Sequence, residues 1–500
     1  MAFSLSERAS GVLLHPTSLP GAYGCGDLGL EAHEFAAWLR GAGQRWWQML
    51  PVGPIGYGNS PYSAHSAFAG SSLLISLDRL AEEGLLPRSA LADAPRFPEG
   101  RADYPGARAW RERCLKIAFQ TFKNRRADQT AFEVFSVQNQ FWLEDFALYA
   151  AIKRSRRDLS WTEWEPELRA RDAEALDRAG HALREEIEQQ RFEQFVFARH
   201  WRALKSRCQE LGIGLIGDVP IFVAHDSADV WAHRELFFLD AQGQPTVIAG
   251  VPPDYFSATG QRWGNPLYRW RELEQSGYRF WLQRISQMLE RFDAVRLDHF
   301  IGFQRYWEIP ADEPTALRGR WVPGPGAKLF EALREAHGTL PLIAEDLGAV
   351  TPEVTALRDA FNLPGIKLLQ FAFGTDPQGP SFLPYNYCRN SVAFTGTHDN
   401  DTTRGWFEKL GETERRAALD YLGSEGRAIH WEMIRCVWAS VANLALAPAQ
   451  DLLGLGSEGR MNLPGTASGN WEWRLAPGQL GSEPQERLRD LTRIYGRRAR

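Results

Sequence analysis

Short apolar runs with a preference for β structure alternate with amphipathic helical segments along this chain of 500 residues. Helical periodicity is clear in 182–211 and in 278–292, where Leu282, Ile285 and Leu289 fall on one face. Strands that alternate with helices predict an α/β protein with a parallel sheet, and eight such units predict a closed (β/α)8 TIM barrel. Eight runs are predicted to be its strands: 11–15, 46–51, 214–218, 294–298, 342–345, 366–373, 392–395 and 444–448.

The spacing of the predicted strands is uneven, and its long gaps predict insertions into the barrel. Residues 78–185 lie between the second and third strands, and several helices with proline-rich breaks predict an inserted helical subdomain there. Residues 223–278 lie between the third and fourth strands. They contain strand-like residues and then a loop rich in Gly, Pro and aromatic residues, which predicts an ordered functional loop. Only a loop and a helix at 484–495 follow the eighth strand, so residues 1–500 are predicted to form one barrel domain.

Composition argues against several classes of partner. The net charge is −5, so no basic field favours nucleic acid. No stretch approaches the roughly 18 apolar residues of a membrane span, and the N-terminal residues lack the hydrophobic segment of an export signal. The five cysteines are scattered without a CxxC spacing, which argues against a zinc site and favours a reducing compartment. We expect a soluble, cytoplasmic protein with no nucleic-acid or membrane partner.

Acidic residues stand at the ends of four predicted strands: Asp218, Asp298, Glu345 with Asp346 beside it, and Asp399. A single carboxylate after a strand often caps the next helix, and this is the ordinary explanation for any one of them. In a parallel barrel, however, the carboxyl ends of all strands meet at one face, where the active sites of such barrels lie. Acids gathered there repel one another unless they bind a cation or take part in a reaction. The pattern therefore predicts either a metal site or a site for glycosyl transfer.

The neighbours of these acids favour glycosyl transfer. Hard-cation sites combine closely spaced acids with backbone carbonyls, and no such loop is present, so we expect neither a metal nor a cofactor. Arg296 precedes Asp298 by two residues, so both side chains point to the same side of the strand, and the guanidinium would keep Asp298 ionised as a nucleophile. Glu345 has no cation nearby in the sequence, which suits the raised pKa of a general acid. Asp401 and Thr402 are expected to cap the helix that follows Asp399.

Ten sequence blocks carry a family resemblance: GVLLHPTSLPG (11–21), WWQMLPVGP (46–54), GNSPYSAHSAFAG (58–70), IGDVPIFVAHDSADVW (216–231), GVPPDYFSATGQRWGNPLYRW (250–270), VRLDHFIGFQRYW (295–307), IAEDLG (343–348), KLLQFAF (367–373), TGTHDNDTTRGW (395–406) and RMNLPGTASGNWEWR (460–474). In this order they resemble the amylomaltase (disproportionating enzyme) type of 4-α-glucanotransferase, glycoside hydrolase family 77 of the α-amylase clan. The resemblance implies transfer between α-1,4-glucans such as maltooligosaccharides, amylose and glycogen. It also fits a barrel that lacks the C-terminal β-sandwich usual in the clan. We expect a monomer.

The same resemblance implies roles for individual residues. Asp298 resembles the nucleophile, Glu345 the general acid/base, and Asp399 the third essential acid, which binds the 2- and 3-hydroxyls of the sugar. Trp263 and Tyr62 are expected to shield the intermediate from water. Substrate contacts are implied at Tyr62, Asp218, Arg296 and His398 in the donor subsite, at His299 on the acceptor side, at Asp254, Gln261 and Trp263 in the lid loop, and at Asn462. A second glucan contact, away from the reaction, is expected at Tyr57 and Tyr104.

Three other functions stay open at this stage. An α-1,4-glucan hydrolase of the same clan would use the same three acids. A glucan-binding protein on an inactive barrel would have no need to keep all three. A histidine-based metal hydrolase would need two or three of the strand-end histidines to converge with an open coordination position, and Arg296 beside Asp298 argues against a cation there.

Overall fold

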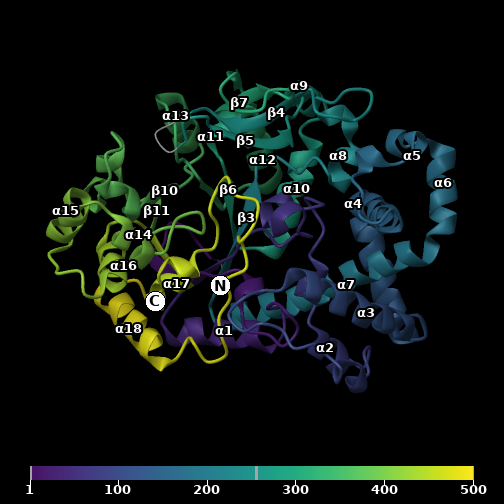
Figure 1. The fold of residues 1–500 in the computed structure, drawn as a ribbon, viewed down its shortest axis with the longest axis horizontal. Helices are drawn as coiled ribbons and strands as arrows, with labels where there is room; N and C mark the ends of the chain where they lie inside the picture. The colour runs from purple at the N-terminus through teal and green to yellow at the C-terminus, as the bar shows by residue number, and fades with distance from the viewer. Residues whose placement is uncertain (1–2, 254–256, 499–500) are drawn as a thin grey trace.

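Eight parallel strands close into a barrel in the computed structural model, which describes residues 3–253 and 257–498 (Figure 1). Around the barrel the strands follow the order β1, β12, β11, β10, β9, β6, β3, β2. All eight strands expected from the sequence are present, and the fold is the predicted (β/α)8 barrel. Their bounds are β1 Ala9–Leu13, β2 Trp46–Gln48, β3 Gly214–Pro220, β6 Ala294–Asp298, β9 Leu342–Ala344, β10 Gly365–Leu368, β11 Ser391–Phe394 and β12 Leu444–Pro448.

The alternation of side chains along the strands builds two layers of core. Within β2, Trp46 packs into the cluster that fills the barrel, whereas its neighbour Trp47 packs in the outer cluster with the helices. Each strand of the barrel contributes at least one residue to the inner cluster, among them Ala9, Trp46, Ile216, Ala294, Ile343, Ile366, Val392 and Leu444. The interior is therefore filled by apolar side chains, and polar chemistry is left to the strand ends.

One predicted strand is shorter than the sequence suggested. The run 366–373 was expected to be extended throughout, but β10 ends at Leu368 and a 3-10 turn occupies Leu369–Phe373. The ring of Phe373 packs 6.1 Å from that of Trp406 and 5.7 Å from that of Tyr421. The apolar residues of this turn pack against neighbouring helices. A continuous apolar run looks the same in the sequence whether it forms a buried strand or a buried turn.

The chain between β2 and β3 is helical and lies beside the barrel, on the right of Figure 1. The predicted helix 182–211 is α7, Arg184–Glu210, and it packs along α4 and α3. The buried Lys153 in α4 pairs with Asp226, in the loop after β3, at 2.6 Å. The other helices of this region are α2 Leu77–Glu82, α3 Tyr104–Lys123, α4 Gln129–Ser155, α5 Pro166–Ala170 and α6 Ala173–Ala182.

A second, antiparallel sheet lies above β3 and β6 in Figure 1. The strand-like residues of 236–251 form β4, Val247–Val251, which pairs with β5, Gln261–Pro266. On its other side β4 pairs with β7, Arg305–Pro310, and β7 pairs with β8, Arg320–Pro323. The sequence did not predict β7 and β8, because each has only a short strand pattern within the segment between β6 and β9. The loop that follows β3 is thus held by residues that follow β6.

The remaining predicted helices are α10, Arg279–Arg291, and α18, Ser482–Ile494. The helix α18 packs on α1, Leu30–Gly41, and on α16, Ile429–Ala439. Other helices that border the barrel are α8 Ala228–Ala232, α9 Trp270–Gln275, α11 Ile301–Gln304, α12 Ala327–His337, α13 Pro352–Ala360, α14 Thr403–Lys409, α15 Glu412–Leu422 and α17 Ala449–Leu452. No helix among the described residues has both the length and the apolar content to traverse a bilayer.

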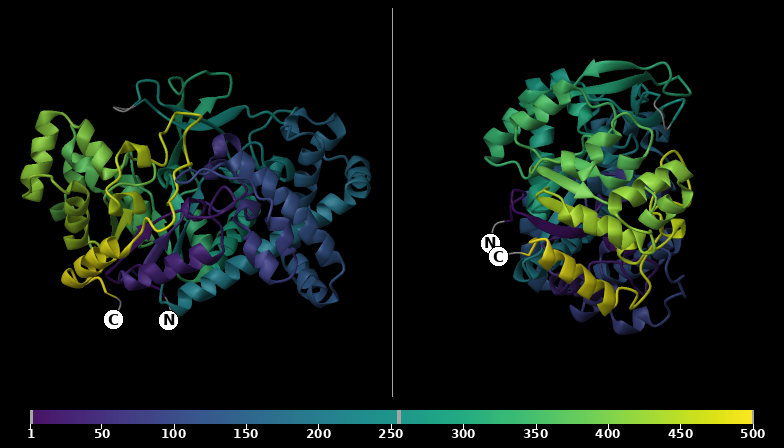
Figure 2. Two further views of the ribbon diagram at one scale, coloured as in Figure 1. Left: turned by 60° about the horizontal axis from the view of Figure 1, so that its bottom comes forward. Right: turned by 90° about the vertical axis from the view of Figure 1, so that its left-hand side faces the viewer.

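The first and last described residues of the chain lie on the same side of the molecule (Figure 2). Arg497, after α18, is fully buried, and its guanidinium joins the end of the chain to β1 and to the residues before β12. It donates to the carbonyls of Ala9 at 2.8 Å, Asn443 at 3.1 Å and Trp438 at 2.7 Å. Further acceptors are the carbonyls of Val437, Ser440 and Ala442.

Replacing Arg497 by Met should destabilise the fold, because several buried carbonyls would lose a charged donor. We expect a loss of about 3 kcal/mol in the free energy of unfolding, measured as a lower midpoint in denaturant or thermal melts. Arg498→Met is the matched control, since Arg498 is the next residue and is exposed. Equal midpoints for the two variants would contradict a structural role for Arg497.

Candidate active site

Three acids from separate parts of the chain meet at the carboxyl ends of the strands. Asp298 is the last residue of β6, and Glu345 follows β9, the neighbour of β6 in the barrel. The backbone N–H of His299 donates to Glu345 Oε2 at 2.7 Å, which fixes Glu345 beside the end of β6. Asp399 follows β11, and it is connected to the other acids through contacts from His398 to Tyr62 and from Tyr62 to Asp218.

A buried arginine holds the acids of β3 and β6. Arg296 is 3% exposed and pairs in register with Asp218 of β3. Its Nε donates to Asp218 Oδ2 at 2.9 Å, and its Nη2 donates to Asp298 Oδ1 at 2.7 Å. Asp218 therefore pairs with a cation and does not cap a helix. Asp346, next to Glu345, has a different partner, because it pairs with Arg358 at 2.5 Å and accepts from the N–H of Ile366.

Burial raises the pKa values of both central acids, and Arg296 decides which of them ionises first. Burial and the charges of Asp218 and Asp399 raise the pKa of Asp298 to about 7, while Arg296 opposes this shift. Burial and the charge of Asp298 raise the pKa of Glu345 well above its ordinary value. Because the guanidinium contacts Asp298 and not Glu345, it stabilises the carboxylate form of Asp298 more directly than that of Glu345.

Tyr62 and His398 connect this pair to Asp399. The Tyr62 hydroxyl donates to Asp218 Oδ2 at 2.7 Å, so its oxygen accepts from His398 Nε2 at 2.7 Å. The two rings are stacked with centroids 5.3 Å apart, and His398 Nε2 lies 3.4 Å from Asp399 Oδ2. Burial lowers the pKa of His398, which therefore stays neutral with its proton on Nε2. The neutral imidazole thus lies between the Tyr62 hydroxyl, to which it donates, and the Asp399 carboxylate, which it contacts without adding a charge.

The loop 460–474 completes the surroundings of Asp399. Asn462, a predicted substrate contact, donates from its Nδ2 to Asp399 Oδ1 at 2.6 Å. Arg460 Nη2 donates to the Asp399 carbonyl and its Nε to the Asn462 carbonyl, both at 2.7 Å. Trp471 packs 5.7 Å from Tyr62 and 5.9 Å from His398. Sequence reasoning selected only Asn462 from this block, because contacts made to backbone carbonyls leave no side-chain signal.

The predicted lid residues stand over His299. Trp263, on β5, is 38% exposed, and its ring meets that of His299 edge to face at 4.8 Å. Trp263 Nε1 donates to Gln261 Oε1 at 3.1 Å, so these two residues are joined. Burial lowers the pKa of His299 to about 4, which leaves the ring neutral. Asp254 lies outside the described residues.

The two tyrosines expected at a second glucan contact differ in their exposure. Tyr57 is 81% exposed and presents its ring to solvent. Tyr104 is 3% exposed, because its hydroxyl donates to the Trp471 carbonyl at 2.7 Å and contacts Thr17 at 3.1 Å. A buried ring offers no face to a sugar, so the prediction for Tyr104 is wrong. Its hydroxyl instead holds the backbone of Trp471 through this hydrogen bond.

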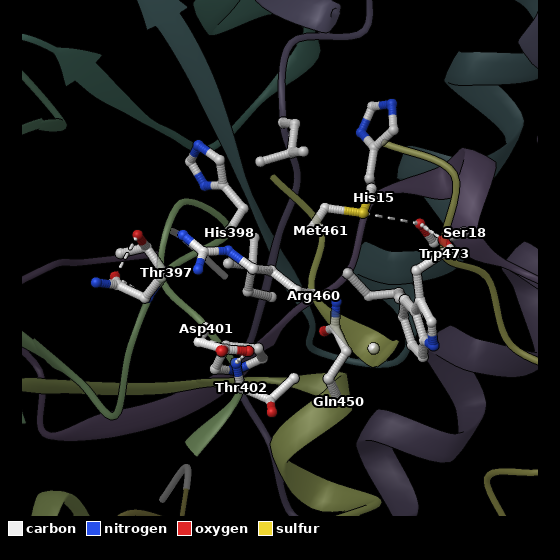
Figure 3. Close-up of a pocket in the computed structure, with 16 residues that line it drawn as sticks. His15, Ser18, Thr397, His398, Asp401, Thr402, Gln450, Arg460, Met461 and Trp473 are labelled. Carbon is white, nitrogen blue, oxygen red and sulfur yellow. Dashed lines mark hydrogen bonds between the residues drawn. The ribbon is translucent and has the colours of Figure 1, made fainter. Parts of the chain in front are cut away.

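A small cavity lies behind the site, and Figure 3 shows His398 and His15 at its border. Its volume is about 20 Å³, enough for one water molecule and too small for a sugar. Arg460, Thr397 and Gln450 also line it. Within the described part of the chain, no three His, Cys, Asp or Glu side chains are grouped to hold a metal ion. The cation among the acids is the guanidinium of Arg296.

Comparison with known proteins agrees with this geometry. Residues 14–479 match the family model described as 4-alpha-glucanotransferase. The curated 4-alpha-glucanotransferase of Thermus thermophilus is 53% identical over 494 residues, which cover 97% of this chain and 98% of the relative. That of Synechocystis sp. is 50% identical over 502 residues and covers 99% of both chains.

Solved structures give the same result. The amylomaltase from Streptococcus agalactiae in complex with acarbose superposes with a TM-score of 0.95 at 38% identity, covering 99% of this chain and 100% of that one. The amylomaltase from Corynebacterium glutamicum superposes with a TM-score of 0.75 at 18% identity, covering 97% and 75%, which shows the shared fold. By its family match, its full-length relatives and its barrel, this chain belongs to the 4-α-glucanotransferase (amylomaltase) family, glycoside hydrolase family 77.

Proposed function

We propose that the chain transfers segments of α-1,4-glucans by a retaining double displacement in which Asp298 and Glu345 act as a pair. Asp298 attacks the anomeric carbon of the donor while Glu345 protonates the leaving 4-oxygen. A covalent glucosyl-enzyme forms and the shortened glucan or glucose departs. Glu345 then removes the proton from the 4-hydroxyl of an acceptor glucan, which attacks the same carbon and releases Asp298. The observation that carries the proposal is the unequal environment of the two acids: Arg296 contacts Asp298 and not Glu345.

The groups around Asp399 support a role in holding the donor sugar. Asp399 would accept hydrogen bonds from the 2- and 3-hydroxyls, and these strengthen as the ring flattens toward the transition state. His398 and Asn462 orient this carboxylate through the contacts described above. Tyr62 would stack on the sugar, while Asp218 and Arg296 fix its hydroxyl and the nucleophile.

Transfer in place of hydrolysis requires that water be kept from the glucosyl-enzyme. Trp263 and Gln261 stand beside His299, the residue after the nucleophile, and the proposal assigns them, with Asp254, to the acceptor side. An acceptor glucan bound there would occupy the space that an attacking water needs. Tyr57 remains the proposed contact for a more distant part of the glucan, supported by its exposed ring.

The proposed setting is that of a cytoplasmic monomer acting on maltooligosaccharides, amylose or glycogen. Its five cysteines are free thiols, which fits a reducing compartment. The relative from Streptococcus agalactiae was solved with the oligosaccharide acarbose, which supports an α-glucan as the ligand class. In this proposal residues 1–500 form one catalytic unit, with 78–185 and 223–278 as insertions between barrel strands.

Maltotriose tests the reaction and the nucleophile together. The wild-type protein should convert maltotriose into glucose and a ladder of longer glucans, whereas a hydrolase would give short products only. Asp298→Asn should lower kcat by at least about 10³-fold, because the amide is a poor nucleophile. Near-normal transfer by this variant, seen by time-resolved product analysis, would refute the assignment of Asp298.

The pH profile tests the division of charge between the two acids. Activity needs Asp298 deprotonated and Glu345 protonated, so the acidic limb of the profile follows Asp298 and the basic limb follows Glu345. Arg296 lowers the pKa of both groups. Arg296→Met should therefore lower activity and move both limbs to higher pH, the acidic one by roughly one unit. Arg318→Met, at a solvent-exposed arginine, is the control; limbs that stay in place in both variants would argue against the role of Arg296.

The lid tryptophan should affect the fate of the intermediate more than its formation. In Trp263→Ala we expect the ratio of hydrolysis to transfer to rise by roughly tenfold, a change of about 1.4 kcal/mol between the competing barriers. Free reducing ends and transfer products from maltotriose measure this ratio. Trp321→Ala removes a tryptophan from the same small sheet at β8 and serves as control. An unchanged ratio in Trp263→Ala would remove its shielding role.

A further inference from the structure

The seven residues 396–402, which carry His398 and Asp399, leave the barrel and return to it at one buried carboxylate. Asp451 Oδ2 accepts from the hydroxyl of Thr395, just before this loop, at 2.6 Å. The same oxygen accepts from the hydroxyl of Thr403, just after the loop, at 2.6 Å. Asp451 Oδ1 accepts from the backbone N–H of Thr403 at 2.7 Å. One side chain thus holds both ends of the segment that presents the third acid.

The position of Asp451 makes this clamp rigid. Asp451 lies in α17, directly after β12, and β12 pairs in parallel with β11, the strand that leads into Thr395. Asp451 is 1% exposed, and Thr395 and Thr403 are fully buried. Hydrogen bonds to an ionised carboxylate are short and strong, and three of them satisfy a group that would otherwise be costly to bury. The clamp therefore joins the ends of two neighbouring strands to the start of α14.

Other groups hold the middle of the segment, whereas Asp451 binds the residues at its two ends. Asn400 Oδ1 accepts from the N–H and hydroxyl of Thr397 at 2.8 and 2.9 Å and shapes the turn. Thr402 caps α14 by accepting from the N–H of Gly405 at 3.0 Å, as predicted. Asp401, also expected at this cap, accepts from Lys409 and Ser457 and contacts the N–H of Thr402. None of these groups reaches both ends of the segment.

We propose that Asp451 is a positioning residue for the transfer reaction, which acts by fixing the two ends of 396–402 and so the place of the Asp399 carboxylate. This inference rests on the proposed role of Asp399 in holding the donor sugar. A displacement of about 1 Å at a group that stabilises the transition state can cost about 10²-fold in rate. Loosening the clamp should therefore act on kcat more than on KM, because Asp399 contributes most when the sugar ring is distorted.

Conservative variants at the three partners test the proposal. Asp451→Asn keeps the shape but removes the charge, and Thr395→Val and Thr403→Val each delete one hydroxyl donor without changing the volume. With maltotriose, Asp451→Asn should lower kcat by about 10²-fold and each threonine variant by about tenfold, with KM changed less than about threefold. Thr492→Val is the matched control, since Thr492 is a fully buried threonine on α18 that also bonds through its hydroxyl. It should lose stability without this fall in kcat.

A double-mutant cycle separates positioning from general stability. In an Asp399→Asn background the clamp has no carboxylate left to position, so adding Thr403→Val should cost less than about twofold in the residual rate. A full tenfold loss in that background, or unchanged kcat in the single variants, would overturn the inference. Should Asp451→Asn not fold, the threonine variants alone decide. The proposed function fails separately, if Asp399→Asn itself keeps normal activity.

Discussion

The buried guanidinium of Arg296 is the interaction on which the site depends. Carboxylates from β3, β6 and β9 lie at adjacent strand ends, and their mutual repulsion in a buried setting would protonate or separate them. Arg296 contacts Asp218 and Asp298 directly and Tyr62 through its hydroxyl. Because Asp218 and Arg296 are register partners on paired strands, the sheet itself fixes the cation between the acids. The backbone hydrogen bonds that pair β3 with β6 in the barrel therefore also place the guanidinium of Arg296 beside the carboxylate of Asp218.

The sequence predicted the barrel and the central acids for related reasons. Apolar runs such as that ending at Asp298 show both where a strand lies and where it stops, and a parallel barrel brings all such ends together. The pairing of Arg296 with Asp298 follows from their two-residue spacing alone. The residues of 366–373 lacked such a stop signal, so the end of β10 at Leu368 could not be located. Pattern identifies a buried segment, but tertiary packing decides how far it stays extended.

Other parts of the site leave no mark in local sequence. In the sequence, Tyr104 could be an exposed ring that contacts a sugar, but in the structure it is buried and its hydroxyl donates to the Trp471 carbonyl. Arg460 donates to the backbone carbonyls of Asp399 and Asn462. Because every residue has a backbone carbonyl, the sequence does not show which ones Arg460 will bind. The strands β7 and β8 pair with a segment from another gap in the barrel. In each case the interacting residue is distant in the chain, so the contact can be identified only from the folded structure.

The three acids differ in how their positions are secured. Asp298 belongs to β6, and Glu345 follows β9 and is bound to the next backbone N–H after Asp298, so the sheet places both. Asp399 stands on a loop beyond the end of β11, where no ladder of hydrogen bonds reaches it. Loop-borne groups lose precision unless other residues restrict them. Asp451 and the pair Arg460 and Asn462 supply that restriction from two further segments of the chain, and His398 contacts Asp399 within the same loop. The position of the Asp399 carboxylate thus depends on the closing strands and the C-terminal loop, which explains why residues far from Asp298 in the chain are needed to complete the site.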